Sequence, residues 1–324
     1  MEGFFNGVAR VGGLHPHAWP SRHGVEVLKN ERYKDGTSTA HLMDVYRPAE
    51  RAGLLPVVLY IHGGAFRILS KDTHWIMALA FARRGYVVFN VNYRLAPRFR
   101  YPAAIEDVCH AYAHVVENAE RFGGDPSRIV IAGESAGANL ATSLALTTIH
   151  ERPEPWAKRA FDTNVVPKAV VPACGMFQVS DADRFARRKA GFSPFVADRL
   201  REVQHAYLGP SPDLASIDLA DPLVYLERGF TASRPMPPFF VPVGTKDPLL
   251  DDTRRLVRAL TKMGGVAEEA YYPGEVHAFH AFVMRQAARK CWADTFAFLA
   301  RNGIGPERER PSRIRTGSAR EERV

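Results

Sequence analysis

The feature that most constrains this chain is an apolar run that leads directly into Gly-Glu-Ser-Ala-Gly at residues 133–137. The apolar run covers residues 129–132, and a helix-forming run follows at 138–146. A serine between a strand and a helix sits on a tight, strained turn, and the close passage of helix over strand requires glycine on both sides. The pattern predicts Ser135 as a nucleophile. The alternative is a small-residue turn that merely contains a serine.

Apolar runs and helix-forming runs alternate along most of the chain. Two alternating segments, 25–33 and 39–46, predict an antiparallel pair. Further strands are predicted at 56–61, 86–93, 129–132, 169–173, 239–244 and 268–272, and helices at 72–84, 103–122, 138–146, 249–263 and 282–299. Continuous apolar strands separated by helices indicate an α/β fold with a doubly wound, mostly parallel sheet. Pro242 lacks the amide hydrogen that a central strand needs, which suggests a bulge.

The predicted domain organisation depends on which segments keep the alternation of strands and helices and which interrupt it. Residues 1–302 are predicted to form a single domain, and the basic tail 303–324 is predicted to be disordered. Residues 176–235 interrupt the alternation with phenylalanines, arginines and prolines. We expect this insertion and the apolar segment 1–24 to form a lid over Ser135. The alternative is that residues 1–20 patch the core far from the site.

Composition and charge narrow the classes of function. Hydrophobic residues make up 46% of the 324 residues and charged residues 24%, as in an ordinary globular protein. The three scattered cysteines are expected to be small buried side chains in a reducing compartment, and no spacing suggests a metal site. Neither a secretory leader nor a bilayer-length apolar run is visible, so a cytoplasmic location is expected. The net charge of +8 comes without a nucleic-acid-binding motif, so no nucleic-acid partner is expected.

A nucleophilic serine needs a base and a group that orients the base. In sheets of this kind the order along the chain is serine, acid, histidine. Asp247 and His277 each follow a predicted strand, so both are expected at the sheet edge where open α/β sheets bind ligands. Two alternatives remain at this point. Asp247 could instead cap the following helix, and His280 could be the base.

An oxyanion needs N–H donors that are in place before the reaction. The glycine pair after the 56–61 strand gives a loop with little side chain, and the residue after Ser135 supplies another amide. The predicted donors are Gly63, Gly64, Ala65 and Ala136. His62 is expected to brace the loop by hydrogen bonding rather than to transfer protons.

Together these segments resemble the hormone-sensitive-lipase-like esterases of the α/β-hydrolase fold. The matching segments are His-Gly-Gly-Ala-Phe at 62–66, Tyr-Arg-Leu-Ala-Pro at 93–97, Tyr-Pro-Ala-Ala-Ile-Glu-Asp at 101–107, Gly-Glu-Ser-Ala-Gly-Ala-Asn-Leu-Ala at 133–141, Asp-Pro-Leu at 247–249 and Gly-Glu-Val-His-Ala-Phe at 274–279. The resemblance implies Ser135 as nucleophile, His277 as general base and acid, and Asp247 as its orienting carboxylate. It also implies the oxyanion hole and the lid, and neither a cofactor nor a metal.

Three residues depart from the family pattern. Ala65 stands where a third glycine is common, so its dihedral angles must suit a Cβ atom. Arg98 replaces an acidic residue, which puts an expected ion pair in doubt. Glu134 replaces the commoner Asp before the serine, a conservative change.

The resemblance implies a serine carboxylesterase that acts on small-molecule esters. The predicted lid would leave a pocket of limited depth over Ser135, which favours short to medium acyl chains. An amidase or formamidase with the same triad is one alternative. A non-catalytic receptor is another, because the plant gibberellin receptors resemble this family; that class loses the histidine, which is present here. A homodimer is left open.

Overall fold

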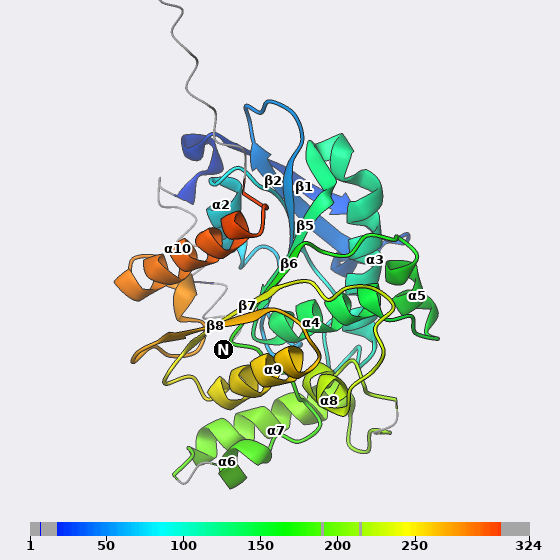
Figure 1. Ribbon diagram of the computed structural model, residues 1–324, viewed down its shortest axis with the longest axis vertical. Helices are drawn as coiled ribbons and strands as arrows, with labels where there is room; N and C mark the ends of the chain where they lie inside the picture. The colour runs from blue at the N-terminus through cyan, green and yellow to red at the C-terminus, as the bar shows by residue number, and fades with distance from the viewer. Residues whose placement is uncertain (1–6, 8–17, 189–190, 214–215, 306–324) are drawn as a thin grey trace, which may run out of the picture.

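The sheet runs through the centre of the molecule, with helices on both of its faces (Figure 1). The structure, a computed structural model, describes residue 7 and residues 18–188, 191–213 and 216–305. Eight strands lie in the order β1-β2-β4-β3-β5-β6-β7-β8. Strands β1 and β2 pair antiparallel with each other, β2 pairs antiparallel with β4, and the others pair parallel. The predicted α/β class and mostly parallel sheet are confirmed.

Most predicted elements are present with shifted ends. The strands are β1 (Val25–Arg32), β2 (Leu42–Pro48), β3 (Leu55–Ile61), β4 (Val87–Val91), β5 (Gly124–Glu134), β6 (Ala169–Ala173), β7 (Phe239–Gly244) and β8 (Ala267–Tyr272). The helices around them are α2 (Trp75–Ala82), α3 (Ala103–Asn118), α4 (Ala136–Ile149), α5 (Pro155–Phe161), α9 (Leu250–Lys262) and α10 (Gln286–Arg301). The last helix was predicted to begin at residue 282. A short 3₁₀ turn, η5 (Phe279–Ala281), precedes it instead.

Strand β3 shows how one apolar run serves both faces of the sheet. Val57, Leu59 and Ile61 belong to the core on the side of α3, α4 and α9. Val58 and Tyr60 belong to a second core formed with α2 and α10. In Figure 1, α2 and α10 lie to the left of the sheet and α3, α4 and α5 to the right. Burial on both faces explains why the run is continuously apolar rather than alternating.

Pro242 does not mark a bulge in the pairing of β7 with β8, where the register is continuous from Phe239 to Gly244. The amide hydrogen that Pro242 lacks would have pointed toward β6, the neighbour of β7 on its other side. There the ladder between β6 and β7 is reduced to the pair Val170 and Phe239. The carbonyl of Pro242 still accepts a hydrogen bond from the amide of Cys174, at 3.0 Å.

The insertion at 176–235 is helical, which its mixed composition did not predict. It contains α6 (Arg184–Arg188), α7 (Pro194–Leu208) and α8 (Pro222–Arg228). Figure 1 places α6 and α7 at one end of the molecule, beside α9. The first part of the predicted lid, residues 1–24, falls mostly outside the described residues, as does the tail from 306 onward.

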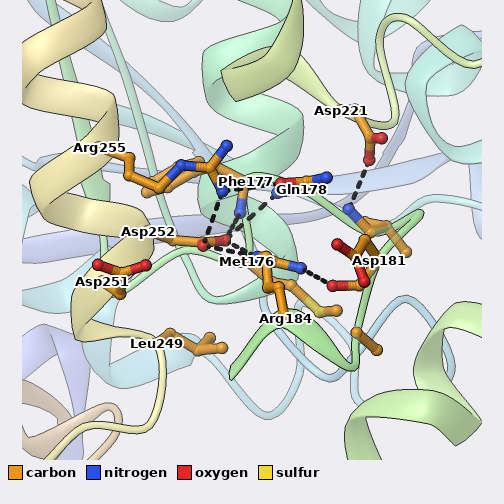
Figure 2. A network of polar contacts seen from close by, with 12 residues as sticks. Met176, Phe177, Gln178, Asp181, Arg184, Asp221, Leu249, Asp251, Asp252 and Arg255 are labelled. Atoms are coloured by element: carbon orange, nitrogen blue, oxygen red, sulfur yellow. Dashed lines mark hydrogen bonds and ion pairs between the residues drawn. The ribbon is translucent and has the colours of Figure 1, made fainter. Parts of the chain in front are cut away.

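A buried ion pair fastens the insertion to the start of α9 (Figure 2). The guanidinium of Arg184 donates to both carboxylate oxygens of Asp252, at 3.1 and 2.5 Å. The second of these oxygens also accepts from the amides of Phe177 and Gln178, at 2.9 and 3.3 Å. Asp252 lies five residues after Asp247, so the insertion is anchored to the helix that follows the loop of the predicted catalytic acid.

Replacing Arg184 with leucine should destabilise the fold by about 3–5 kcal/mol, because it removes the nearest cation from a buried carboxylate and leaves Arg255, at 3.9 Å, as the nearest ion-pair partner of that carboxylate. The control is Arg187→Leu in the same helix. Its ion pair with Asp181 is 61% exposed on the arginine side and should contribute at most about 1 kcal/mol. Urea unfolding of both variants measures the difference. Equal losses of unfolding free energy in the two variants would show that Arg184 does not anchor the insertion.

Candidate active site

Ser135 lies between β5 and α4 with dihedral angles of φ 55° and ψ −117°. A positive φ is strained for a residue with a side chain, and it persists only where the surroundings enforce it. The amide of Ser135 donates to the carbonyl of Ala173 at 3.0 Å, which holds the turn against the end of β6. The predicted strained turn is confirmed.

The glycines on either side of Ser135 are required by close backbone contacts. A Cβ atom at Gly137 would lie 2.1 Å from the carbonyl oxygen of Ile61 and 2.6 Å from that of His62. A Cβ atom at Gly133 would lie 2.6 Å from the carbonyl oxygen of Gly137. The steric reason given for the motif therefore applies, and the same contacts bring the serine turn against the His62 loop.

Asp247 and His277 are joined by a hydrogen bond of 2.9 Å between Oδ2 and Nδ1. Asp247 follows β7 and is buried, and His277 follows β8 with its side chain 35% exposed. The other oxygen, Oδ1, accepts from the amide of Leu249 at 2.8 Å. One carboxylate thus orients the imidazole and also satisfies an amide at the start of α9, so the two interpretations of Asp247 are compatible.

Cys174 connects this pair to the serine turn. Its sulfur, a nitrogen of His277 and an oxygen of Asp247 all lie within 4.8 Å of one another, a grouping that could also hold a metal ion. Burial raises the pKa of the Cys174 thiol. The preceding residue, Ala173, accepts the amide of Ser135. No hydrogen bond joins the Ser135 hydroxyl to His277 among the described residues. Such contacts often tighten only when substrate binds.

The environment of His277 favours its charged form. Burial lowers the pKa, but the Asp247 carboxylate outweighs burial and raises the pKa well above its usual range. Proton abstraction from a serine needs the neutral ring with Nε2 free, so the charge that Asp247 favours is the one that His277 acquires after it takes the serine proton.

His280, the alternative base, is placed differently. It lies in η5, is buried, and makes no hydrogen bond to Asp247 in the described chain. Burial lowers its pKa to about 4, so the ring is neutral under ordinary conditions. The geometry therefore pairs the acid with His277.

One predicted oxyanion donor is wrong. The amide of Gly63 donates to Oε1 of Glu134 at 2.6 Å, so it is not free to bind a substrate oxygen. The amides of Gly64, Ala65 and Ala136 have no acceptor among the described residues. Sequence reasoning treated Glu134 as a conservative change and missed this contact. An acidic side chain next to the serine was the available signal.

The loop after Gly63 is held in an unusual conformation. Ala65 and Phe66 have φ values of 56° and 59°, so the Cβ atom of Ala65 is accommodated in the left-handed region. The carbonyl of Gly64 accepts from the amides of Arg67 and Ile68, at 2.9 and 3.0 Å. These bonds fix the direction of the Ala65 amide, which shares a peptide plane with the Gly64 carbonyl.

His62 stabilises the loop that contains Gly63 and Gly64, as predicted. Its ring is buried, stacks on Tyr93 with centroids 4.3 Å apart, and approaches the Gly63 carbonyl at 2.7 Å. The Tyr93 hydroxyl donates to the His62 carbonyl at 2.9 Å. Burial lowers the pKa of His62 to about 3, which keeps the ring neutral.

Comparison with known proteins agrees with this geometry. A family profile described as the alpha/beta hydrolase fold matches residues 58–281. Carboxylesterase NlhH of Mycobacterium tuberculosis is 31% identical over 241 residues, covering 74% of this chain and 71% of NlhH. The chain belongs to the hormone-sensitive-lipase-like carboxylesterases of the α/β-hydrolase fold. Esterase LipQ of the same species is 32% identical over 248 residues, covering 74% of this chain and 54% of LipQ.

A solved structure, a bacterial heroin esterase, superposes with a TM-score of 0.75 at 22% identity, covering 93% of this chain and 90% of the other. At that identity the superposition shows the fold alone. The predicted family and fold are confirmed. Within the described part of this esterase chain, no helix is long and apolar enough to cross a membrane.

Replacing His277 with alanine should reduce kcat for ester hydrolysis by on the order of 10⁴- to 10⁶-fold, whereas His280→Ala should change it by a few-fold at most. Of these two histidines, His277 is the one that is hydrogen-bonded to Asp247 in the described chain. Steady-state kinetics of both variants, with circular dichroism to check folding, measures this. A severe loss in His280→Ala with a mild one in His277→Ala would move the base to position 280.

Proposed function

We propose that this family member is a serine carboxylesterase in which Ser135 is the nucleophile, His277 the general base and acid, and Asp247 the orienting carboxylate. The observation that carries the proposal is the Asp247–His277 hydrogen bond at 2.9 Å, on loops that meet the strained turn bearing Ser135. The pairing of His277 with a buried acid also argues against a non-catalytic receptor, a class in which that histidine is lost.

In the acylation step, the Ser135 hydroxyl oxygen bonds to the ester carbonyl carbon while its proton moves to Nε2 of His277. The carbonyl electrons move onto the oxygen, which becomes negatively charged. Collapse of this intermediate breaks the bond to the alcohol oxygen, and the alcohol leaves with the proton from His277. Asp247 accepts a hydrogen bond from Nδ1–H, so it fixes the tautomer of the neutral imidazole and stabilises the imidazolium.

In the deacylation step, a water molecule attacks the acyl-enzyme carbonyl and gives a proton to His277. The intermediate then expels the Ser135 oxygen, which recovers that proton, and the carboxylic acid is released. Both intermediates carry a negative oxygen. Gly64, Ala65 and Ala136 are the proposed donors to it, because their amides have no other acceptor in the described chain.

The proposed substrates are small-molecule esters with short to medium acyl groups. Helix α7 of the insertion packs on the loop that follows the glycine pair. The rings of Phe66 and Tyr207 stack there with centroids 3.8 Å apart, and Arg67 pairs with Glu202 at 2.5 Å. This fixed packing beside the proposed oxyanion hole favours a pocket of limited depth over an open channel. A cytoplasmic location, the absence of a nucleic-acid partner and a homodimer stay predictions.

Ser135→Ala should abolish ester hydrolysis, with kcat falling by on the order of 10⁶-fold, because the residues of such a triad act as a unit. The variant should unfold at the same urea concentration as the parent or higher, since alanine removes no buried contact. Hydrolysis of nitrophenyl butyrate by the purified proteins measures the loss. Activity within tenfold of the parent would contradict the assignment.

Acyl-chain length should separate this enzyme from a triglyceride lipase. With nitrophenyl esters of increasing acyl length, kcat/KM should be highest for short and medium chains and should fall for long ones. The variant Tyr207→Ala, which removes the ring stacked on Phe66, should extend the profile toward longer chains. A parent profile that keeps rising with chain length would refute the proposed pocket depth.

A further inference from the structure

A second buried carboxylate–imidazole pair lies directly behind the proposed oxyanion loop. Oε1 of Glu134 accepts from the amide of Gly63 and contacts Nε2 of His74, both at 2.6 Å. Its other oxygen accepts from the hydroxyl of Tyr60. Glu134 immediately precedes Ser135, so this carboxylate holds the loop from the position next to the nucleophile.

The partners of His74 determine where its protons are. Nδ1 faces the carbonyl of Ser70 at 3.1 Å and the hydroxyl of Thr73 at 2.9 Å. The Thr73 hydroxyl donates its own hydrogen to the Ser70 carbonyl at 2.7 Å, so it has none to give to His74. Nδ1 therefore carries a hydrogen. Nε2 faces the Glu134 carboxylate, which already accepts hydrogen bonds from the Gly63 amide and the Tyr60 hydroxyl. These two donors stabilise the negative charge of the carboxylate, and an ionised carboxylate can only accept, so Nε2 carries a hydrogen as well.

The pair is therefore an imidazolium and a carboxylate, almost closed to solvent. The side chains of His74 and Glu134 are 10% and 4% exposed. Burial opposes both charges, but their attraction prevails, lowering the pKa of Glu134 to about 2 and raising that of His74. The other buried histidines next to the pair, His62 and His280, are neutral and cannot supply this positive charge.

We propose that His74 is a positioning residue for ester hydrolysis: its positive charge neutralises the Glu134 carboxylate that anchors the oxyanion loop. This inference rests on the proposed function. The loop needs an acceptor for the Gly63 amide, and a carboxylate is a strong one. Without a counter-charge, however, an anion next to Ser135 would oppose the negative oxygen that forms in the transition state, in a site where charges are weakly screened.

The test is a double-mutant cycle with His74→Gln, Glu134→Gln and the double variant, measured on nitrophenyl butyrate. His74→Gln leaves an uncompensated anion, and kcat should fall about tenfold to 10²-fold, less than the loss of a direct oxyanion donor, with KM little changed. Glu134→Gln alone leaves a buried histidine without its carboxylate and should also lower kcat.

The double variant should be more active than either single variant, because two neutral amides can satisfy the Gly63 amide, the Tyr60 hydroxyl and each other. If the two side chains acted independently of each other, the two losses would add. Should His74→Gln fail to fold, the comparison of Glu134→Gln with the double variant still decides. A double variant no better than either single variant overturns the inference.

A second readout reports on the charge directly. Phenylboronic acid forms a negatively charged tetrahedral adduct with a serine nucleophile, so His74→Gln should weaken its inhibition by the same factor as kcat, and the double variant should restore it. His280→Gln is the matched control, a neighbouring buried histidine without a hydrogen bond to Glu134 in the described chain, and its effects should not be rescued by Glu134→Gln.

The failure of this inference can be told apart from the failure of the proposed function. If Ser135→Ala abolishes ester hydrolysis but the double variant is not rescued, the role of His74 is refuted and the proposed function stands. If the parent enzyme does not hydrolyse esters, the proposed function itself is refuted.

Discussion

The candidate site depends on one close contact, the passage of helix α4 over the end of β3. At Gly137 the helix backbone lies so near the carbonyls of Ile61 and His62 that no side chain can stand between them. This contact sets the serine turn beside the glycine loop, so the amide of Ala136 and the amides of that loop can face the same space. Every residue of α4 is buried, and a rigid helix of this kind can hold the strained φ of Ser135 in place.

A similar contact organises the acid and the histidine. A Cβ atom at Gly244, the last residue of β7, would lie 2.2 Å from the carbonyl oxygen of Glu275. The amide of Lys246 donates to the same carbonyl at 2.9 Å. The loops after β7 and β8 are thereby joined immediately before Asp247 and His277. The two halves of the site are thus built in one way: at a strand end, a glycine lets a second stretch of backbone approach closely.

These local constraints explain what could be predicted from the sequence. The serine motif, the alternation of strands and helices and the pairing of Asp247 with His277 depend on short segments with strong steric or apolar patterns, and they were found. The helices of the insertion were not, because their arginines and prolines gain partners only in the fold: Arg184 meets Asp252 across 68 positions. The role of Gly63 was mistaken for the same reason, since its amide meets a carboxylate 71 positions away. The sequence identifies which backbone amides a loop offers as hydrogen-bond donors. It does not show which of these amides are already bonded to another part of the folded chain.

The site contains two buried carboxylates, each paired with a histidine, and their surroundings decide what each pair can do. His277 is 35% exposed, and only its Nδ1 is bound by its acid, so Nε2 stays available for a proton from the serine. His74 is 10% exposed and has both nitrogens engaged, by Ser70 and Thr73 on one side and by Glu134 on the other. A proton that has no free acceptor cannot be passed on during a reaction, so it acts as a fixed charge. A carboxylate–histidine pair can therefore transfer protons where one ring nitrogen has no other partner, as in His277. Where both ring nitrogens are hydrogen-bonded, as in His74, the pair can only balance charge.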